Sequence, residues 1–221
     1  MESRRWKGWN ILIKVEHLSK KFGNNEVLKD INLHCEKGKI YGIIGYNGSG
    51  KTVLFKCICG FLKSDKGKIL IAEKVLGKDI DMITNAGVII ENPGFIERIS
   101  GYKNLEFLFT IRNKKEKEYI QEVMRKVGLD PFVKKSVKKY SLGMKQRLAI
   151  AQAVMENPDI LILDEPMNGL DKNGIKEMRE LFLALRAEGK TILLASHNKE
   201  DIEILCDEVY EIENATLQKV K

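Results

Sequence analysis

The sequence predicts an α/β fold with a parallel sheet, a β part at the N-terminus and an inserted all-helical segment. Short strand patterns alternate with helical patterns along most of the chain, which is typical of parallel sheets. The run 160–163 is continuously apolar, as in a strand that is buried on both faces. Between Glu91 and Asn157 the apolar spacing is mostly helical, which indicates a separate helical segment.

The first part of the chain has the pattern of a sheet. Residues 11–16 and 30–35 alternate in hydropathy, and the β-branched run 39–44 ends at a glycine. A helix is predicted over 52–59, because Gly60 follows it as a natural stop signal. Two further short strands are predicted, over 68–72 and 87–90.

The middle of the chain is helical by its spacing. Over 104–128 the apolar residues recur at intervals of three and four, which predicts two amphipathic helices. Ser141 is a suitable N-cap for a third helix that runs to Asn157, where Pro158 stops it. After the apolar strand, the pattern predicts the remaining elements: a helix over 172–188, a strand over 191–195, a helix over 199–206 and a strand over 209–212.

The composition limits the classes of function. The chain has 221 residues, of which 43% are hydrophobic, enough to bury a core in one or two domains. Its apolar runs are far shorter than the roughly 20 residues of a membrane-spanning helix, and no signal-peptide pattern follows the basic residues near the start. We therefore expect a cytoplasmic protein. Its four cysteines are expected to be reduced residues of the core.

The chain is basic, with 38 Lys and Arg against 31 Asp and Glu and a formal net charge of +7. Most of the excess lies in two runs, 112–117 and 134–139. Neither run has interleaved aromatic residues or zinc-finger spacing, so both are interpreted as solvated helix faces. No direct nucleic-acid partner is expected.

The most informative segment is 45–52, Gly-Tyr-Asn-Gly-Ser-Gly-Lys-Thr. It matches the phosphate-loop pattern G-x-x-x-x-G-K-[S/T] between a predicted strand and a predicted helix. Its glycines let backbone N–H groups approach phosphate oxygens, and the helix N-terminus favours an anion. Lys51 supplies positive charge for the β and γ phosphates, and the Thr52 hydroxyl is a ligand for Mg²⁺. We therefore predict a P-loop NTPase core that binds nucleotide through Gly45, Asn47, Gly48, Ser49, Gly50, Lys51 and Thr52.

Two carboxylates follow the buried strand at 160–163. Ligands of open α/β sheets bind at the carboxyl ends of the strands, which is where Asp164 and Glu165 stand. Asp164 is placed to hold Mg²⁺ through water, and Glu165 to polarise an attacking water molecule. This pair favours hydrolysis of the nucleotide. The alternative is a strand that ends in a turn with exposed acidic residues.

Together these segments resemble the nucleotide-binding subunit of an ATP-binding-cassette (ABC) transporter. Three more motifs carry the resemblance in the same order along the chain. Residues 140–147, Tyr-Ser-Leu-Gly-Met-Lys-Gln-Arg, are similar to the signature loop of the family. Residues 168–171, Asn-Gly-Leu-Asp, are similar to its D-loop, and residues 195–197, Ala-Ser-His, to its switch-histidine segment.

The resemblance covers residues 11–212 and implies the organisation of the chain. It implies one ABC ATPase domain over residues 1–221, with an antiparallel β part near the N-terminus. Within that domain it implies a nucleotide-binding core over 1–91 and 158–221, and a helical signature subdomain over 92–157.

The resemblance also implies a mechanism with ATP and Mg²⁺ as cofactors. Two copies of the chain would pack head to tail on ATP, so that Ser141 and Gly143 of one copy clasp the γ-phosphate held by the phosphate loop of the other. His197 would act with Glu165 as a catalytic residue that senses the γ-phosphate and positions the water. Asp171 would couple the two sites and Phe22 would stack on adenine. For His197 and Phe22, the alternatives are a surface histidine and an ordinary core residue.

The sequence departs from the usual pattern of the family in two places. Leu142 and Met144 replace a glycine and a glutamine of the signature, and Glu91 replaces a glutamine that reaches Mg²⁺. Glu91 keeps an oxygen for the metal but adds a negative charge near the γ-phosphate, so Glu91→Gln is expected to raise metal-free ATP affinity. With these features, the segment 87–95 is similar to the branch associated with bacitracin and lantibiotic export or immunity.

The implied function is that of a Mg²⁺-dependent ATPase that drives a separately encoded membrane permease from the inner face of the cell membrane. An antimicrobial peptide is the substrate class that the resemblance suggests. Phe95 and Ile96 are candidates for a groove that receives a permease helix, and the alternative is that they belong to the core of the helical subdomain. Two other functions stay open: a non-transport ABC ATPase, and a nucleotide-gated regulatory protein with negligible turnover.

Overall fold

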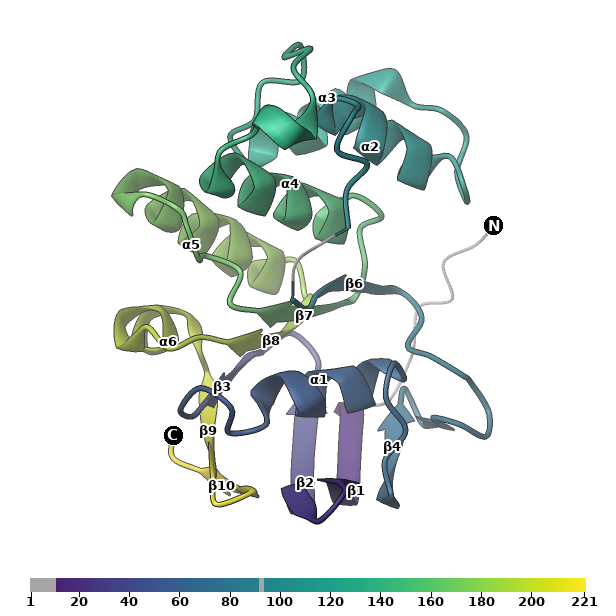
Figure 1. The fold of residues 1–221 in the computed structure, drawn as a ribbon, viewed down its shortest axis with the longest axis vertical. Helices are drawn as coiled ribbons and strands as arrows, with labels where there is room; N and C mark the ends of the chain where they lie inside the picture. Colours follow the sequence, from purple (N-terminus) through teal and green to yellow (C-terminus); the bar gives the residue numbers. More distant parts are fainter. Residues whose placement is uncertain (1–10, 92–93) are drawn as a thin grey trace.

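The computed structural model describes residues 11–91 and 94–221. The first ten residues of the predicted domain, and Asn92 and Pro93 of the segment 87–95, lie outside the described residues. In the described part the chain forms a four-stranded sheet and a six-stranded sheet, with helices packed around them (Figure 1). This arrangement confirms the predicted fold class.

The smaller sheet is antiparallel and comes from the N-terminal part of the chain. Its order is β2-β1-β4-β5, with β1 (Ile11–Phe22), β2 (Asn25–Glu36), β4 (Lys66–Ile71) and β5 (Lys74–Val75). The strands predicted at 11–16 and 30–35 are the buried ends of one long hairpin. Its other end is mostly polar, with Leu18 and Leu28 as its buried residues, so it carries little alternation of hydropathy. β5 was not predicted.

The larger sheet carries the parallel strands. Its order is β10-β9-β3-β8-β7-β6, made of β3 (Ile40–Ile44), β6 (Ala86–Ile89), β7 (Ile160–Asp164), β8 (Thr191–Ala195), β9 (Glu208–Glu213) and β10 (Thr216–Lys219). All neighbouring strands are parallel except β10, which pairs antiparallel with β9 at the edge. The apolar run in β7 is buried, as predicted, and β8 is buried as well. β10 was not predicted.

The strand order brings three loops to one edge of the sheet. β8 lies between β3 and β7, and these three strands run in the same direction. The segments that follow them therefore leave the sheet side by side. They are the phosphate-loop segment that starts at Gly45, the acidic turn at Glu165, and the segment that contains His197. The topology thus gathers the predicted chemistry at the carboxyl ends of the strands.

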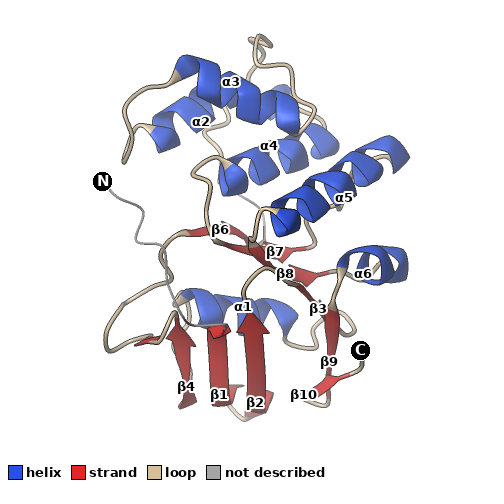
Figure 2. Ribbon diagram, turned by 180° about the vertical axis from the view of Figure 1, so that it is seen from behind, coloured by secondary structure: helices blue, strands red, loops and turns tan. Residues whose placement is uncertain are grey.

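Helices cover both faces of the parallel sheet (Figure 2). α1 (Lys51–Cys59) lies between the two sheets, while α5 (Lys172–Ala187) and α6 (Lys199–Leu205) lie on the opposite face. Successive side chains of a strand point to opposite faces, so β7 contributes to two cores. Leu161 and Leu163 pack with the helices of the outer face, and Ile160 and Ile162 pack with α1 and the antiparallel sheet.

The middle of the chain forms α2 (Gly101–Phe109), α3 (Lys117–Lys126), the 3₁₀ turn η1 (Val137–Lys139) and α4 (Leu142–Val154). The predicted N-cap is confirmed, because the Ser141 hydroxyl accepts a hydrogen bond from the Met144 N–H at 3.2 Å. The predicted end at Asn157 is wrong by three residues. Asn157 adopts a left-handed φ of 50° before Pro158, which turns the chain out of the helix.

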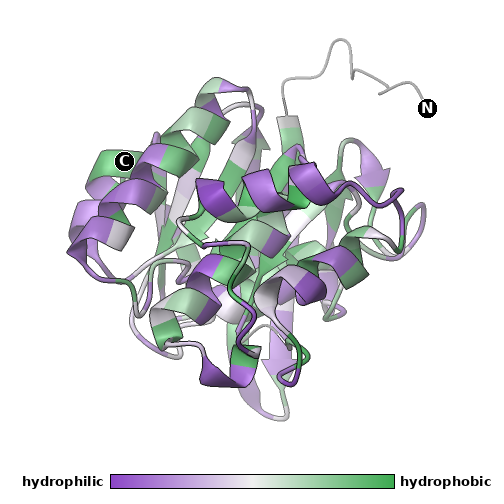
Figure 3. Ribbon diagram, turned by 90° about the horizontal axis from the view of Figure 1, so that it is seen from above, coloured by the Kyte–Doolittle hydropathy of each residue, from purple (hydrophilic) through white to green (hydrophobic). Residues whose placement is uncertain are grey.

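The two amphipathic helices predicted over 104–128 correspond to α2 and α3, and α3 buries Ile120, Val123 and Met124 on one side. Hydrophilic and hydrophobic residues lie on different sides of the helices in Figure 3, as in amphipathic helices that cover a core. Within 11–91 and 94–221, no helix is both long enough and apolar enough to cross a membrane. The expected burial of the four cysteines is confirmed. All are buried free thiols, namely Cys35, Cys57, Cys59 and Cys206.

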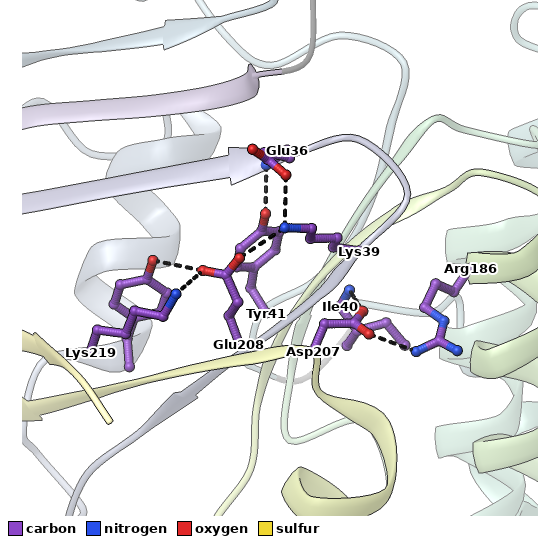
Figure 4. A network of polar contacts seen from close by, with 9 residues as sticks. Glu36, Lys39, Ile40, Tyr41, Arg186, Asp207, Glu208 and Lys219 are labelled. Atoms are coloured by element: carbon purple, nitrogen blue, oxygen red, sulfur yellow. Dashed lines mark hydrogen bonds and ion pairs between the residues drawn. The ribbon is translucent and has the colours of Figure 1, made fainter. Parts of the chain in front are cut away.

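A polar network ties together the starts of β3 and β9 (Figure 4). The Lys39 ammonium lies 3.0 Å from a carboxylate oxygen of Glu208. Asp207 accepts from the backbone N–H of Ile40 at 2.8 Å and pairs with the Arg186 guanidinium at 2.8 Å. Because Arg186 belongs to α5, the network joins that helix to two strands of the parallel sheet.

Glu208 is the acidic centre of this network. Partial burial favours the neutral carboxyl, but hydrogen bonds from Lys219, Lys39 and Tyr210 favour the ionised form and together outweigh burial. The pKa of Glu208 is therefore lower than its ordinary value of 4.5. The network holds Glu208 ionised near neutral pH.

Candidate nucleotide site

The phosphate loop runs from Gly45 to Gly50 between β3 and α1. Gly50 has a left-handed φ of 112°, and a Cβ there would lie 3.0 Å from the Val27 carbonyl oxygen. Both the backbone angle and this close approach of the neighbouring sheet require a glycine. Lys51 is 7% exposed and donates to the carbonyl oxygens of Gly45 at 2.7 Å and Tyr46 at 3.2 Å. Its ammonium therefore lies within the curve of the loop.

Ser49 and the N-terminus of α1 give the loop further donors. In the described part of the chain, the Ser49 hydroxyl is buried without a hydrogen-bond partner. Such an orphan donor is costly unless an acceptor is supplied, and a phosphate oxygen is a suitable one. The free N–H groups at the start of α1 favour the same anionic group. The residues of the loop thus fit a phosphate.

Thr52 and Asp164 bring two oxygen ligands together. The Thr52 hydroxyl donates to a carboxylate oxygen of Asp164 at 2.6 Å, which joins the start of α1 to the end of β7. Mg²⁺ prefers oxygen ligands and is usually bound by one or two carboxylates together with the substrate phosphates. The chemistry of this donor set fits the predicted ion.

Glu165 and His197 form a pair beside this metal-ligand set. Glu165 has a left-handed φ of 50°, and its N–H donates to the Ala195 carbonyl oxygen at 2.9 Å. Nδ1 of His197 lies 2.9 Å from the carboxylate oxygen Oε2 of Glu165. An ionised carboxylate only accepts, so this hydrogen bond places the proton on Nδ1. The arrangement gives a carboxylate that an imidazole orients.

A buried ion pair supports the segment that carries His197. Asp201 of α6 is 2% exposed and accepts from the Arg179 guanidinium of α5, with an Nε distance of 2.9 Å. Its second oxygen accepts from the Ser196 hydroxyl at 3.3 Å, and that hydroxyl in turn accepts from the N–H of Asn198 at 3.1 Å. The pair therefore fixes the backbone on both sides of His197. Sequence reasoning missed this support.

A cavity of about 430 Å³ lies against these groups, which is within the range of small-molecule sites. Its lining includes eight of the predicted site residues: Asn47, Gly48, Gly50, Lys51, Thr52, Glu91, Asp164 and Glu165. The other lining residues were not assigned to the site from the sequence: Val27, Val53, Leu142, Gln146 and Asn168. Phosphate loop, acidic turn and start of α4 therefore surround one space.

Seven predicted site residues lie outside this lining. Gly45 and Ser49 belong to the phosphate loop, and His197, which contacts Glu165, lines a separate cavity together with Gly45. The remaining four are Phe22, Ser141, Gly143 and Asp171. The Phe22 side chain is 50% exposed and has the Lys20 ammonium 5.5 Å from its ring centroid. Ser141 caps α4, and Asp171 caps α5 by accepting from the Gly174 N–H at 2.8 Å. Gly143 is half-buried at the first turn of α4. Their roles toward a nucleotide stay predictions.

Two side-chain contacts at the cavity could not be predicted from the sequence. The Gln146 amide of α4 donates to the Pro166 carbonyl oxygen at 2.7 Å, directly after Glu165. The Glu91 carboxylate lies 2.5 Å from the ammonium of Lys56, on α1. Glu91 has a left-handed φ of 59° at the end of β6. Lys51 and Lys56 both lie in the helix that the sequence predicts over 52–59 or directly before it. Nothing in the sequence indicated that Lys56 would pair with Glu91.

The comparisons with known proteins decide the family. The family model for ABC transporters matches residues 28–168. The uncharacterized ABC transporter ATP-binding protein YybJ of Bacillus subtilis is 41% identical over 94% of this chain and 95% of its own length. The chain belongs to the ABC transporter family. It is therefore an ATP-binding subunit and an ATPase, which confirms ATP as the predicted nucleotide.

Two further comparisons concern the branch of the family and the fold. The bacitracin transport ATP-binding protein BcrA of Enterococcus faecalis is 41% identical over 89% of the cassette and 64% of its own length. The predicted similarity to that branch is thus confirmed. The dimeric cassette MJ0796, solved with ADP and Pi after hydrolysis, has a TM-score of 0.83, 20% identity and coverage of 95% and 99% of the two chains. That likeness shows the ABC cassette fold.

Proposed function

We propose that the cassette hydrolyses Mg²⁺-bound ATP as a head-to-tail dimer and drives a separately encoded membrane permease. The observation that carries the proposal is the position of the Glu165–His197 pair beside Thr52 and Asp164 at one sheet edge. Lys51 and the loop N–H groups bind the phosphates, and Thr52 and Asp164 are the oxygen ligands for Mg²⁺. When bound, Mg²⁺ neutralises charge on the β and γ phosphates.

In this proposal Glu165 is the general base that accepts a proton from the attacking water. His197 holds the Glu165 carboxylate through Nδ1–H. In the closed dimer its other ring nitrogen would donate to the γ-phosphate. Gln146 and the Glu165 N–H hold the backbone of the acidic turn on both sides. The strained φ of Glu165 is therefore kept in place by contacts from two other elements.

The proposed dimer uses the start of α4. The Ser141 hydroxyl accepts a hydrogen bond as N-cap, so its own proton is left to donate to a phosphate oxygen. The first N–H groups of α4, among them that of Gly143, point from the same helix terminus. These donors would meet the γ-phosphate bound by a second copy, and Asp171 would lie beside the seam.

Glu165→Gln tests the catalytic part of the proposal. The amide cannot accept the proton from water, so we expect ATP turnover to fall at least about 100-fold while ATP binding is retained. ATP should then hold the variant as a dimer in size-exclusion chromatography. Glu180→Gln removes an exposed carboxylate elsewhere on the cassette and should leave turnover unchanged. Turnover near wild type in the Glu165 variant would remove Glu165 from the mechanism.

A second cavity, of about 810 Å³, is the proposed docking site of the permease. It lies between the β6 side of the sheet and the helical segment, and exposed apolar side chains of Phe61, Met82 and Ile111 line it. Glu91 lines this groove as well as the nucleotide cavity, so the two spaces share a wall. A helix end of a membrane subunit, with apolar anchors, is the occupant that fits such a groove.

The groove is not built from the residues that the sequence suggested. Phe95 packs against the core of the outer face, and Ile96 is 38% exposed, but neither lines the groove. Phe61→Asp with Ile111→Asp should weaken co-purification of the permease and spare ATP binding. Phe132→Asp changes a similarly exposed aromatic outside the groove and is the matched control. Unchanged assembly of the double variant would contradict this docking site.

The relatives support a proposal for the substrate class and the location. The name of BcrA says that it serves bacitracin transport, and we propose an antimicrobial peptide as the substrate of the present transporter. The cassette would work at the inner face of the cell membrane, where its permease presents the docking helix. Loss of peptide resistance in cells that carry Glu165→Gln, with the permease still present, would support this substrate class. Unchanged resistance would exclude it.

A further inference from the structure

Glu91 shares its charge with a residue of the helix that follows the phosphate loop. Its carboxylate lies 2.5 Å from the Lys56 ammonium, and the two side chains are 64% and 31% exposed. Lys56 lies on α1, five residues after Lys51, and lines the groove but not the nucleotide cavity. Glu91 lines both. The ion pair therefore lies in the wall between the two spaces.

The nucleotide cavity is rich in negative charge even before a nucleotide is considered. Among the described residues three carboxylates line it, those of Glu91, Asp164 and Glu165, against the one ammonium of Lys51. A nucleotide adds the charge of its phosphates, which like charges repel. An ammonium at 2.5 Å cancels most of the field of the Glu91 carboxylate beyond a few ångströms. Together Lys56 and Glu91 are nearly neutral, like a single uncharged amide.

We propose that Lys56 is a charge-compensating residue that sets how strongly the nucleotide site depends on Mg²⁺. This role of Lys56 rests on the proposed function, in which Glu91 lies near the metal. With Lys56 in place, Glu91 neither repels metal-free phosphates strongly nor attracts Mg²⁺ strongly. Without Lys56 the bare carboxylate does both, so metal-free ATP binds more weakly and less Mg²⁺ is needed for binding.

Each residue of the pair cancels the charge of the other. Removing either one should therefore change the metal-free ATP affinity in opposite directions. Removing Glu91 leaves an unpaired ammonium near the phosphates and should strengthen metal-free ATP binding. Removing Lys56 leaves an unpaired carboxylate and should weaken it. Removing both restores a nearly neutral wall. The two single changes thus act in opposite directions, and the double change should return the site to the wild-type behaviour.

The experiment measures the affinity for a fluorescent ATP analogue in EDTA and then across a Mg²⁺ titration. Lys56→Met should weaken metal-free binding about two- to fivefold, as befits a solvent-exposed pair, and lower the Mg²⁺ concentration at half-maximal binding. Glu91→Gln should strengthen metal-free binding by a similar factor. The Lys56→Met, Glu91→Gln double variant should lie within about twofold of wild type, and high salt should shrink every difference.

Lys63→Met is the matched control, because Lys63 is an exposed lysine close in sequence that lines neither space. It should leave all affinities unchanged. Wild-type affinities in Lys56→Met overturn the proposal, as does a double variant that shows no recovery. If Glu91→Gln alone shifts the Mg²⁺ titration, the metal role of Glu91 stands without Lys56. If the wild-type cassette shows no Mg²⁺ dependence, the proposed function itself fails.

Discussion

Replacing Gly87 by alanine should separate the parallel sheet from the helix that carries the signature motif. Gly87 lies in β6 and faces the last turn of α4. A Cβ at this position would lie 1.9 Å from the Ala153 carbonyl oxygen and 2.8 Å from Cδ2 of Leu161. Real Cβ contacts essentially never fall below 3.0 Å, so the backbone of β6 or α4 must move by at least about 1.1 Å. A helix backbone cannot yield as a flexible side chain can.

The expected cost is at the upper end of the range for overpacking, about 3 kcal/mol or more. For a chain of this length such a loss lowers Tm by roughly 6–12 °C. Urea unfolding and calorimetry measure both quantities. Gly94→Ala is the control, because no atom of the described residues lies within 4 Å of a Cβ at that glycine, and it should change stability little. A loss below about 1 kcal/mol in Gly87→Ala would refute the close packing of β6 on α4.

Two further predictions concern the supports of the site and the sheet. Asp201→Asn removes the buried carboxylate that pairs with Arg179 and leaves the guanidinium with the exposed Glu200 carboxylate at 3.0 Å, so it should cost about 1.5–3 kcal/mol in urea unfolding, the range for a hydrogen bond to a charged group. A loss under about 1 kcal/mol would contradict it. The lowered pKa of Glu208 means that its network stabilises the fold above about pH 4.5, and that this stability is lost as the pH falls through the folded-state pKa. Glu208→Gln should therefore lower Tm at pH 7 and converge with wild type as the pH falls below 4.5, and parallel curves would exclude this role.

The candidate nucleotide-binding residues could be named from the sequence because their chemistry is local. A phosphate loop needs glycines, a lysine and a hydroxyl within one turn between a strand and a helix, and the segment 45–52 contains them all. The pair of acids after a buried apolar strand is just as local. Once the strands were known to be parallel, Asp164 and Thr52 had to meet at one sheet edge, where their 2.6 Å hydrogen bond is found.

Long-range contacts could not be predicted in this way. Glu91 was assigned to the metal from its place in a motif, yet its ion pair with Lys56 depends on how β6 lies against α1. Gln146 contacts the acidic turn, and Asp201 contacts Arg179, only because helices of different segments pack on one sheet. Polar side chains like these occur all along the chain, so their types alone do not name their partners.

The apolar residues of the groove also depend on long-range packing and could not be named from the sequence. Phe95 and Ile96 were plausible groove residues because they are apolar and lie in a loop. Burial is decided by the neighbours that cover a side chain, and Phe95 packs against the core while Phe61 and Ile111 stay exposed. Hydropathy reports the tendency of a residue to be buried and not the surface that buries it.

By itself the sequence determined the fold class, the order of most elements and the residues of the phosphate loop and acidic turn. These depend on backbone conformation and on the alternation of side chains along one element, which a few neighbouring residues control. The tertiary structure alone decided the Lys56–Glu91 pair, the supports of Glu165 and His197, and the lining of the groove. Each of these joins side chains far apart in the chain, and only the packing of helices on the two sheets brings them within contact distance.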